Sequence, residues 1–309
     1  TLLYNFLSSI LRAVGDSRTP FLFLAFSACL NVVLELICNI VFKRGCAGAA
    51  FATITAQANS GLCCLIFIIK KVQILHPKRK DCHLQPVYVK EMLVMGLPMG
   101  LQFSITAIGS MVMQSANNGL GSIYVSGFTA GMRIKQFAMC PFDALANGVS
   151  VFCSQNLGAG KIKRIRKGLW QGVGVGFIYG LLIGLVLIFA GRSLSMLFIS
   201  ADQTAVLDAS AKYLRCLGFF YWSLGPLSVF RMSAQGMGFS GRAIFSGVTE
   251  MIARTFVSFA FVGTYGFTAI CFADQTAWVS ATLYITPVCL MCLRQVTREH
   301  ERHQAKIAD

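Results

Sequence analysis

Apolar residues occur along this chain in long runs separated by short polar segments, and the length of the runs sets the expected fold. The runs cover residues 2–42, with a polar break at 12–18, and then 46–69, 92–117, 123–153, 169–199, 205–235, 243–263 and 267–293. A helix needs about 20 apolar residues to cross the roughly 30 Å hydrocarbon core of a bilayer. The pattern therefore predicts an all-α membrane protein with eight complete spans and the end of an earlier one.

The run at 20–42 is the most informative about function, because two polar residues lie near its middle. Asn31 and Glu35 are four positions apart, so a helix places both on one face. An acidic residue at mid-bilayer costs about 2.5–3.5 kcal/mol on insertion scales, and such residues usually face protein or water. We expect this pair to face a polar cavity. The alternative is a neutral Glu35 that is hydrogen-bonded to Asn31 and joins helices.

Composition excludes a water-soluble domain. Of the 309 residues 55% are hydrophobic and 13% are charged, and the mean hydropathy is +0.65. An enzyme active site within the membrane would need clustered histidines or paired aspartates inside the runs, and the sequence has neither. All four histidines fall in polar loops or in the tail, so we expect no metal site and no enzyme.

The distribution of the basic residues behind the net charge of +15 indicates how the chain is oriented in the membrane. Eighteen lysines and arginines fall on one set of alternate loops and the tail, against three on the opposite loops. This bias is the positive-inside pattern of cytoplasmic loops, so it predicts a cytoplasmic C-terminus. We therefore expect the charge to contact anionic membrane lipid, and we expect no nucleic-acid partner.

Two pairs of segments repeat along the chain at nearly one offset. The turn RAVGDSRTP at 12–20 resembles QGMGFSGRA at 235–243, and aligning Gly15 with Gly238 gives an offset of 223 residues. The segment beginning at Gly45 resembles the one beginning at Gly266, at an offset of 221. Both copies cross the membrane in the same sense, so we predict a parallel internal repeat. By this arithmetic about three and a half spans are missing from the start of the first copy.

Other polar residues lie inside the predicted spans. GLPMGLQ, at 96–102, places Pro98 within a helix and predicts a bend that serves either movement or structure alone. The span from 123 contains Arg133, Lys135, Gln136, Asp143 and Asn147. These residues either line a water-filled cavity, or Arg133 pairs with an acid elsewhere.

Two acidic residues of the later spans have structural interpretations. Glu250 and Arg254 are four apart and can form a neutralised pair along one helix. Asp274 is expected near the outer surface at the start of the last span, where a helix N-terminus favours a carboxylate.

Together, several segments resemble the multidrug and toxic compound extrusion (MATE) family. They are RAVGDSRTP with LNVVLE, GCAGAAFAT, GLPMGLQ, QNLGAGKIKRIRKG and CFADQTAW, in family order over almost the whole chain. The resemblance implies a two-lobe helical transporter of twelve helices, of which about eight and a half are present. It assigns 1–71 to the C-terminal half of the first lobe, 72–90 to a cytoplasmic linker, 91–294 to the second lobe and 295–309 to a cytoplasmic tail.

The resemblance also implies a function. Family members are antiporters of the cytoplasmic membrane that export small organic, often cationic, compounds in exchange for protons or sodium ions. In the DinF-like branch an Asn and an Asp on helix five bind the coupling cation. Here Asn31 matches the Asn, Glu35 stands at the Asp position, and Asn5 on helix four joins the site.

Other features of the resemblance complete the expected site. In the NorM-like branch the acids of the second lobe fall at positions that hold Thr106 and Pro226 here, which favours the DinF-like arrangement. Candidate cavity-lining residues are Gln102, Thr106, Arg133 and Gln136. The expected protein is a monomer with no cofactor besides the coupling ion. The alternative is a flippase for lipid-linked precursors, which shares the two-lobe plan and whose cavity would be lined with arginines.

Overall fold

The computed structural model describes residues 2–76 and 83–308, and within them every regular element is helical. The chain divides into two compact units, Thr1–Gln85 and Pro86–Asp309. Among the described residues seven helices are long and apolar enough to cross a membrane, which agrees with the predicted class of all-α membrane protein. Large apolar side chains such as Phe189 remain exposed on them, as expected for surfaces that face hydrocarbon.

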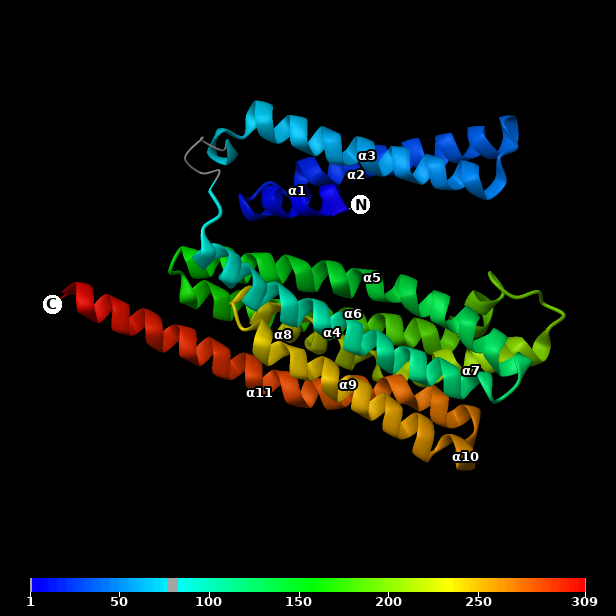
Figure 1. Cartoon of the computed structure of the whole chain (residues 1–309). Helices are drawn as coiled ribbons and strands as arrows, with labels where there is room; N and C mark the ends of the chain where they lie inside the picture. The colour runs from blue at the N-terminus through cyan, green and yellow to red at the C-terminus, as the bar shows by residue number, and fades with distance from the viewer. Residues whose placement is uncertain (1, 77–82, 309) are drawn as a thin grey trace. The chain divides into compact units, whose positions relative to one another are not determined.

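The first unit is a small helical hairpin with one additional helix (Figure 1). Its elements are α1 (Leu2–Ala13), α2 (Arg18–Leu36), the π-helical turn η1 (Ile37–Val41), α3 (Gly45–Lys71) and the 3-10 turn η2 (Gln73–Leu75). Buried Tyr4, Leu11 and Cys64 form its core, and Tyr4 donates a hydrogen bond to the carbonyl of Pro20 at 2.9 Å. The basic residues Lys78, Arg79 and Lys80 of the predicted linker lie outside the described residues.

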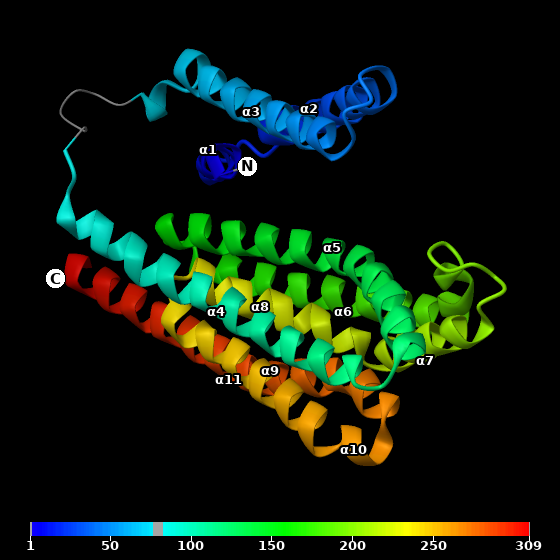
Figure 2. The same ribbon diagram turned by 45° about the vertical axis from the view of Figure 1, so that its right-hand side comes forward.

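The second unit is a bundle of long helices that run side by side (Figure 2). The elements are α4 (Pro86–Asn118), α5 (Ser122–Gly158), α6 (Ile162–Ser195), α7 (Thr204–Phe220), η4 (Tyr221–Ser223), α8 (Leu224–Gly236), α9 (Ser240–Ala260), α10 (Val262–Tyr265) and α11 (Phe267–Ala308). In this unit α9 packs against α4 and α11, and α5 against α6, α7 and α8. Residues 86–90, which the sequence placed in the linker, form the start of α4.

The apolar run at 205–235 was predicted as one span, and the structure divides it. A 3-10 turn at Tyr221–Ser223 separates α7 from α8. Pro226 stands in the first turn of α8, where a proline is tolerated, but it would clash with the carbonyl four residues earlier if the helix were continuous. The break thus places Pro226 where it is tolerated, whereas Pro98, Pro141 and Pro287 lie inside continuous helices.

Glycines on α6 allow the helices of the second unit to approach closely. Gly176, Gly180 and Gly184 are four residues apart and buried. A Cβ atom at Gly180 would lie 2.7 Å from the Cα atom of Trp222, and one at Gly184 would lie 2.5 Å from the carbonyl oxygen of Gly218. Small residues at this spacing are typical of helix contacts within membranes.

The repeated segments found in the sequence share a backbone geometry. Gly15 and Gly238 have φ of 95° and 94°, and Gly45 and Gly266 have φ of 52° and 54°. The first pair also closes its helix with equivalent hydrogen bonds. The amide of Asp16 donates to the carbonyl of Leu11 at 3.0 Å, and that of Phe239 to Ala234 at 3.0 Å. These are Schellman caps, in which the left-handed residue favours glycine. The two copies thus agree in structure as well as in sequence.

Candidate functional site

The Asn31 side chain connects α2 with α3. Its Nδ2 donates to the Oγ1 of Thr53 at 3.4 Å, and Thr53 in turn donates to the carbonyl of Ala49 at 3.0 Å. Glu35 is half-buried on the same face of α2, one turn later. Among the described residues neither a hydrogen bond nor an ion pair ends on its carboxylate. The bond between Asn31 and Glu35 that the structural alternative required is therefore not formed.

The helix changes geometry directly after Glu35. Helix α2 ends at Leu36, and residues Ile37–Val41 continue it as a π-helical turn. Such turns are rare and are frequent at functional sites, because they rotate the side chains on either side relative to each other. No pattern in the sequence predicted this turn. Asn5 lies on α1 with an exposed side chain, and in the described part of the chain no hydrogen bond joins it to Asn31 or Glu35.

The four predicted cavity-lining residues fall into two pairs, with Gln102 and Thr106 together on α4 beside Gly247 and Arg133 and Gln136 on α5. Gln102 is buried between helices and accepts a hydrogen bond from the Nε2 of Gln235 at 2.6 Å. The carbonyl of Thr106 accepts a bond from the Nη1 of Arg254 at 3.4 Å. Arg133 is exposed and lines a cavity of about 350 Å³ beside the α6–α7 connection, and Gln136 is exposed elsewhere on α5.

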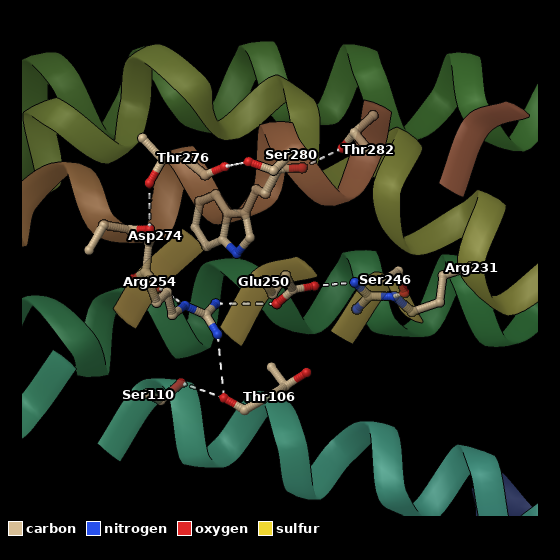
Figure 3. A network of polar contacts seen from close by, with 12 residues as sticks. Thr106, Ser110, Arg231, Ser246, Glu250, Arg254, Asp274, Thr276, Ser280 and Thr282 are labelled. Atoms are coloured by element: carbon tan, nitrogen blue, oxygen red, sulfur yellow. Dashed lines mark hydrogen bonds and ion pairs between the residues drawn. The ribbon is translucent and has the colours of Figure 1, made fainter. Parts of the chain in front are cut away.

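A buried network of ion pairs lies at the centre of the second unit (Figure 3). The Asp274 side chain is fully buried in α11, eight residues into the last apolar run as the sequence defines it. One of its oxygens, Oδ2, accepts from the Nζ of Lys135 at 2.6 Å and from the hydroxyl of Tyr213 at 2.9 Å. The other oxygen, Oδ1, accepts from the Nε of Arg254 at 2.9 Å. This carboxylate therefore joins α5, α7, α9 and α11.

The network continues along one face of α9. Ser246, Glu250 and Arg254 follow at intervals of four, so a helix brings them into one row. The carboxylate of Glu250 pairs with Arg254 at 3.4 Å and with Arg231 of α8, and the Nε of Arg231 donates to the Oγ of Ser246 at 2.9 Å (Figure 3). Through Glu250 and Arg254, this row of residues connects α8 to the carboxylate of Asp274.

The network holds the three cations Lys135, Arg231 and Arg254 and the two acids Glu250 and Asp274. A third acid, Asp143 of α5, lies within electrostatic range of Arg231, so acids and cations are equal in number in this region. The ammonium of Lys135 also lies 5.6 Å from the ring centre of Trp278, an arrangement that stabilises a cation. Each charge has a partner, so the arrangement can hold five elements in one register in a low-dielectric interior.

The structure corrects two expectations. Asp274 was expected at a helix N-terminus near the outer surface, but it is buried inside α11, whose first residue is Phe267. The basic residue of α5 that pairs with a distant acid is Lys135, not Arg133. The predicted pair of Glu250 and Arg254 is formed. The spacing of charged residues within apolar runs was the available signal, but it does not reveal which distant helices meet.

Comparison with known proteins gives a consistent result. Residues 98–260, more than half of the chain, match the family model described as MatE. The chain is 32% identical over 269 residues to Probable multidrug resistance protein YpnP of Bacillus subtilis, covering 86% of this chain and 57% of that protein. It is 25% identical over 230 residues to the FAD transporter of Shewanella oneidensis, covering 71% and 49%. The chain spans about half the length of the curated relatives it matches.

Solved structures show the same fold. A multidrug resistance MATE family transporter in an outward-facing conformation is similar with a TM-score of 0.89 at 18% identity, covering 95% of this chain and 66% of that one. The Vibrio cholerae MATE transporter VcmN in its bent form is similar with a TM-score of 0.82 at 21% identity, covering 96% and 66%. The chain belongs to the MatE family, whose multi-pass members are membrane transport proteins and not enzymes.

Proposed function

We propose that the chain is part of a secondary antiporter that exports small organic, cationic compounds across the cytoplasmic membrane in exchange for protons or sodium ions. The observation that carries this proposal is Glu35, a half-buried carboxylate that has no bonding partner among the residues the structure describes and lies on a helix long and apolar enough to span a membrane. Relatives named for multidrug resistance or multidrug export support the direction and the substrate class. We further propose that the protein acts as a monomer with its C-terminus in the cytoplasm.

The proposed exchange needs one carboxylate that takes either a proton or a sodium ion from one side of the membrane and releases it on the other. Asn31 lies one turn before Glu35 on the same face of α2, and its Nδ2 donates to Thr53, so we propose that its amide oxygen joins the cation site. A ligand that binds one of two conformations more tightly shifts the population toward that conformation. Movement of one charge through 100 mV supplies about 2.3 kcal/mol, which is sufficient to drive export against a gradient.

The buried network has a supporting part in this proposal. Its residues are nearly inaccessible, so they hold the second unit together while the substrate path changes. Two-state transport requires lobes that move without losing their internal packing. We therefore assign stability to Asp274 and its partners, and ion exchange to Glu35.

A second candidate is a transporter of anionic organic compounds. It is favoured by the relative named FAD transporter and by the exposed cation Arg133, which lines a cavity of about 350 Å³. Lipid-linked precursors, the substrates of the flippase that was the alternative function, would also be anionic.

One transport experiment separates the candidates. The complete gene product is reconstituted in vesicles, and uptake of a cationic dye or of FAD is followed with proton and sodium gradients imposed one at a time. The proposal predicts that one gradient drives the dye and neither drives FAD. Gradient-driven FAD uptake without dye uptake would select the second candidate.

A further inference from the structure

A basic pocket lies at the end of the second unit where α6 begins, away from the buried network. It is formed by the turn at Gly160, the first turns of α6 and the C-terminal part of α11, and its volume is about 1040 Å³. The ring of His300 on α11 packs over Gly160, which has a φ of 65°, and both residues line the pocket. Both walls belong to one compact unit, so the pocket is a feature of its fold.

Cations without counter-ions surround this pocket. The basic side chains that line it are Lys161, Lys163, Arg164 and Arg166 at the start of α6, and Arg294 and Arg298 on α11. Among the described residues none of these six forms an ion pair with a carboxylate, and the lining contains one acid, Glu301. Like charges at this density repel one another, so the pocket attracts an anion.

The backbone adds to this field. Helix α6 has 34 residues, it begins in the pocket, and neither an acidic residue in its first turn nor a capping side chain satisfies its first amides. The N-terminus of a helix carries about half a positive charge and presents free N–H groups, both of which favour phosphate. The pocket thus combines side-chain cations with backbone donors.

The floor of the pocket is apolar. Leu290 and Leu293 of α11 and the indole of Trp170 line it, and Trp170 is 49% exposed although it lies in an apolar helix. An edge-to-face contact with Phe230 at 5.9 Å between ring centres fixes the orientation of the indole. Tryptophans with this partial exposure are typical of the headgroup level of a membrane. A soluble phosphate would not use such a floor, whereas the first carbons of an acyl chain would.

From this combination we infer that the basic pocket binds the phosphate headgroup of an anionic phospholipid, with the glycerol and upper acyl carbons against Trp170. The bound phosphate bridges Arg164 on α6 and Arg298 on α11 and neutralises their repulsion. The inference concerns the cytoplasmic rim of the second unit and does not depend on the substrate or the coupling ion.

The test uses a matched pair of double variants of the complete gene product purified in detergent. Arg164→Gln with Arg298→Gln removes one cation from each wall. Lys167→Gln with Arg302→Gln removes the same charge from the same two helices at exposed positions outside the lining. Native mass spectrometry and thermal unfolding are followed during titration with phosphatidylglycerol, phosphatidylcholine or inorganic phosphate.

We expect phosphatidylglycerol to bind and to raise the unfolding temperature of the wild type and of the control variant. A basic residue near an anionic lipid is worth about fivefold in affinity, so the pocket variant should bind about 25-fold more weakly. Phosphatidylcholine and inorganic phosphate should have little effect. Equal loss in both variants would overturn the inference. Protection by inorganic phosphate at the same concentrations would show a soluble anion site and overturn the assignment to lipid.

Discussion

Removal of the Asp274 carboxylate is the change that the second unit should tolerate least. In Asp274→Asn the amide can no longer neutralise Lys135 and Arg254, whose side chains are 8% and 4% exposed. Removal of one partner of a buried ion pair costs about 3–5 kcal/mol, because it leaves an uncompensated charge in a low-dielectric interior. Arg254 keeps Glu250, so most of the loss should come from Lys135.

The chain offers a matched control for this prediction. Asp208 also pairs with an arginine, Arg192, at 3.3 Å, but the two side chains are 63% and 53% exposed. Exposed pairs contribute about 0–1 kcal/mol, so Asp208→Asn should be nearly neutral. The free energy of unfolding is measured by denaturant titration in detergent for both variants. Equal losses in the two variants would refute the structural importance of the buried network.

A second variant keeps the prediction testable if Asp274→Asn does not fold. Adding Lys135→Met removes the stranded cation with a side chain of similar length. If Asp274→Asn does not fold, the double variant should recover a folded protein; if it does fold, the double variant should be more stable, with a coupling energy of about 0.5–3 kcal/mol. A double variant that is less stable than the single variant would show that the two residues act independently.

Further expectations concern the first unit and the helix contacts. Asn31→Ala and Thr53→Ala each remove the 3.4 Å bond between α2 and α3, so each should lower the free energy of unfolding by about 0.6 kcal/mol. Only Asn31→Ala should also change the dependence of transport on sodium or protons. The same ion dependence in both variants would reduce Asn31 to a structural residue. Gly180→Ala should cost about 1–3 kcal/mol because its Cβ would meet the backbone of Trp222, whereas Gly174→Ala on the same helix has open space and should be neutral in the same titration.

The sequence predicts those parts of the structure that depend on local spacing. The lengths of apolar runs give the spans, and the shared φ values of Gly15 and Gly238 follow from a turn that repeats in the sequence. The spacing of Glu250 and Arg254 predicts an intrahelical pair, which is formed. In each case the signal lies within about one turn of a helix or within one repeated segment.

The rest depends on contacts between distant helices. Lys135 and Asp274 are 139 residues apart, and their pairing follows from the rotation of α5 and α11 in the bundle, which one-dimensional spacing does not encode. The break at Tyr221–Ser223 interrupts an apolar run that is continuous in the sequence, and Pro226 alone does not indicate it, because Pro98 and Pro141 lie inside unbroken helices. The π-helical turn after Glu35 likewise has no pattern in the sequence.

The central claim is that Glu35 couples export to an ion gradient, and the most direct measurement compares Glu35→Gln with Glu91→Gln, an exposed acid at the start of α4. Both complete gene products are reconstituted in vesicles, and uptake of a cationic dye is measured with and without a proton or sodium gradient. The amide keeps the shape of the side chain and removes its charge, so gradient-driven uptake should be lost in Glu35→Gln and kept in Glu91→Gln. Uptake by Glu35→Gln at the wild-type rate would contradict the account.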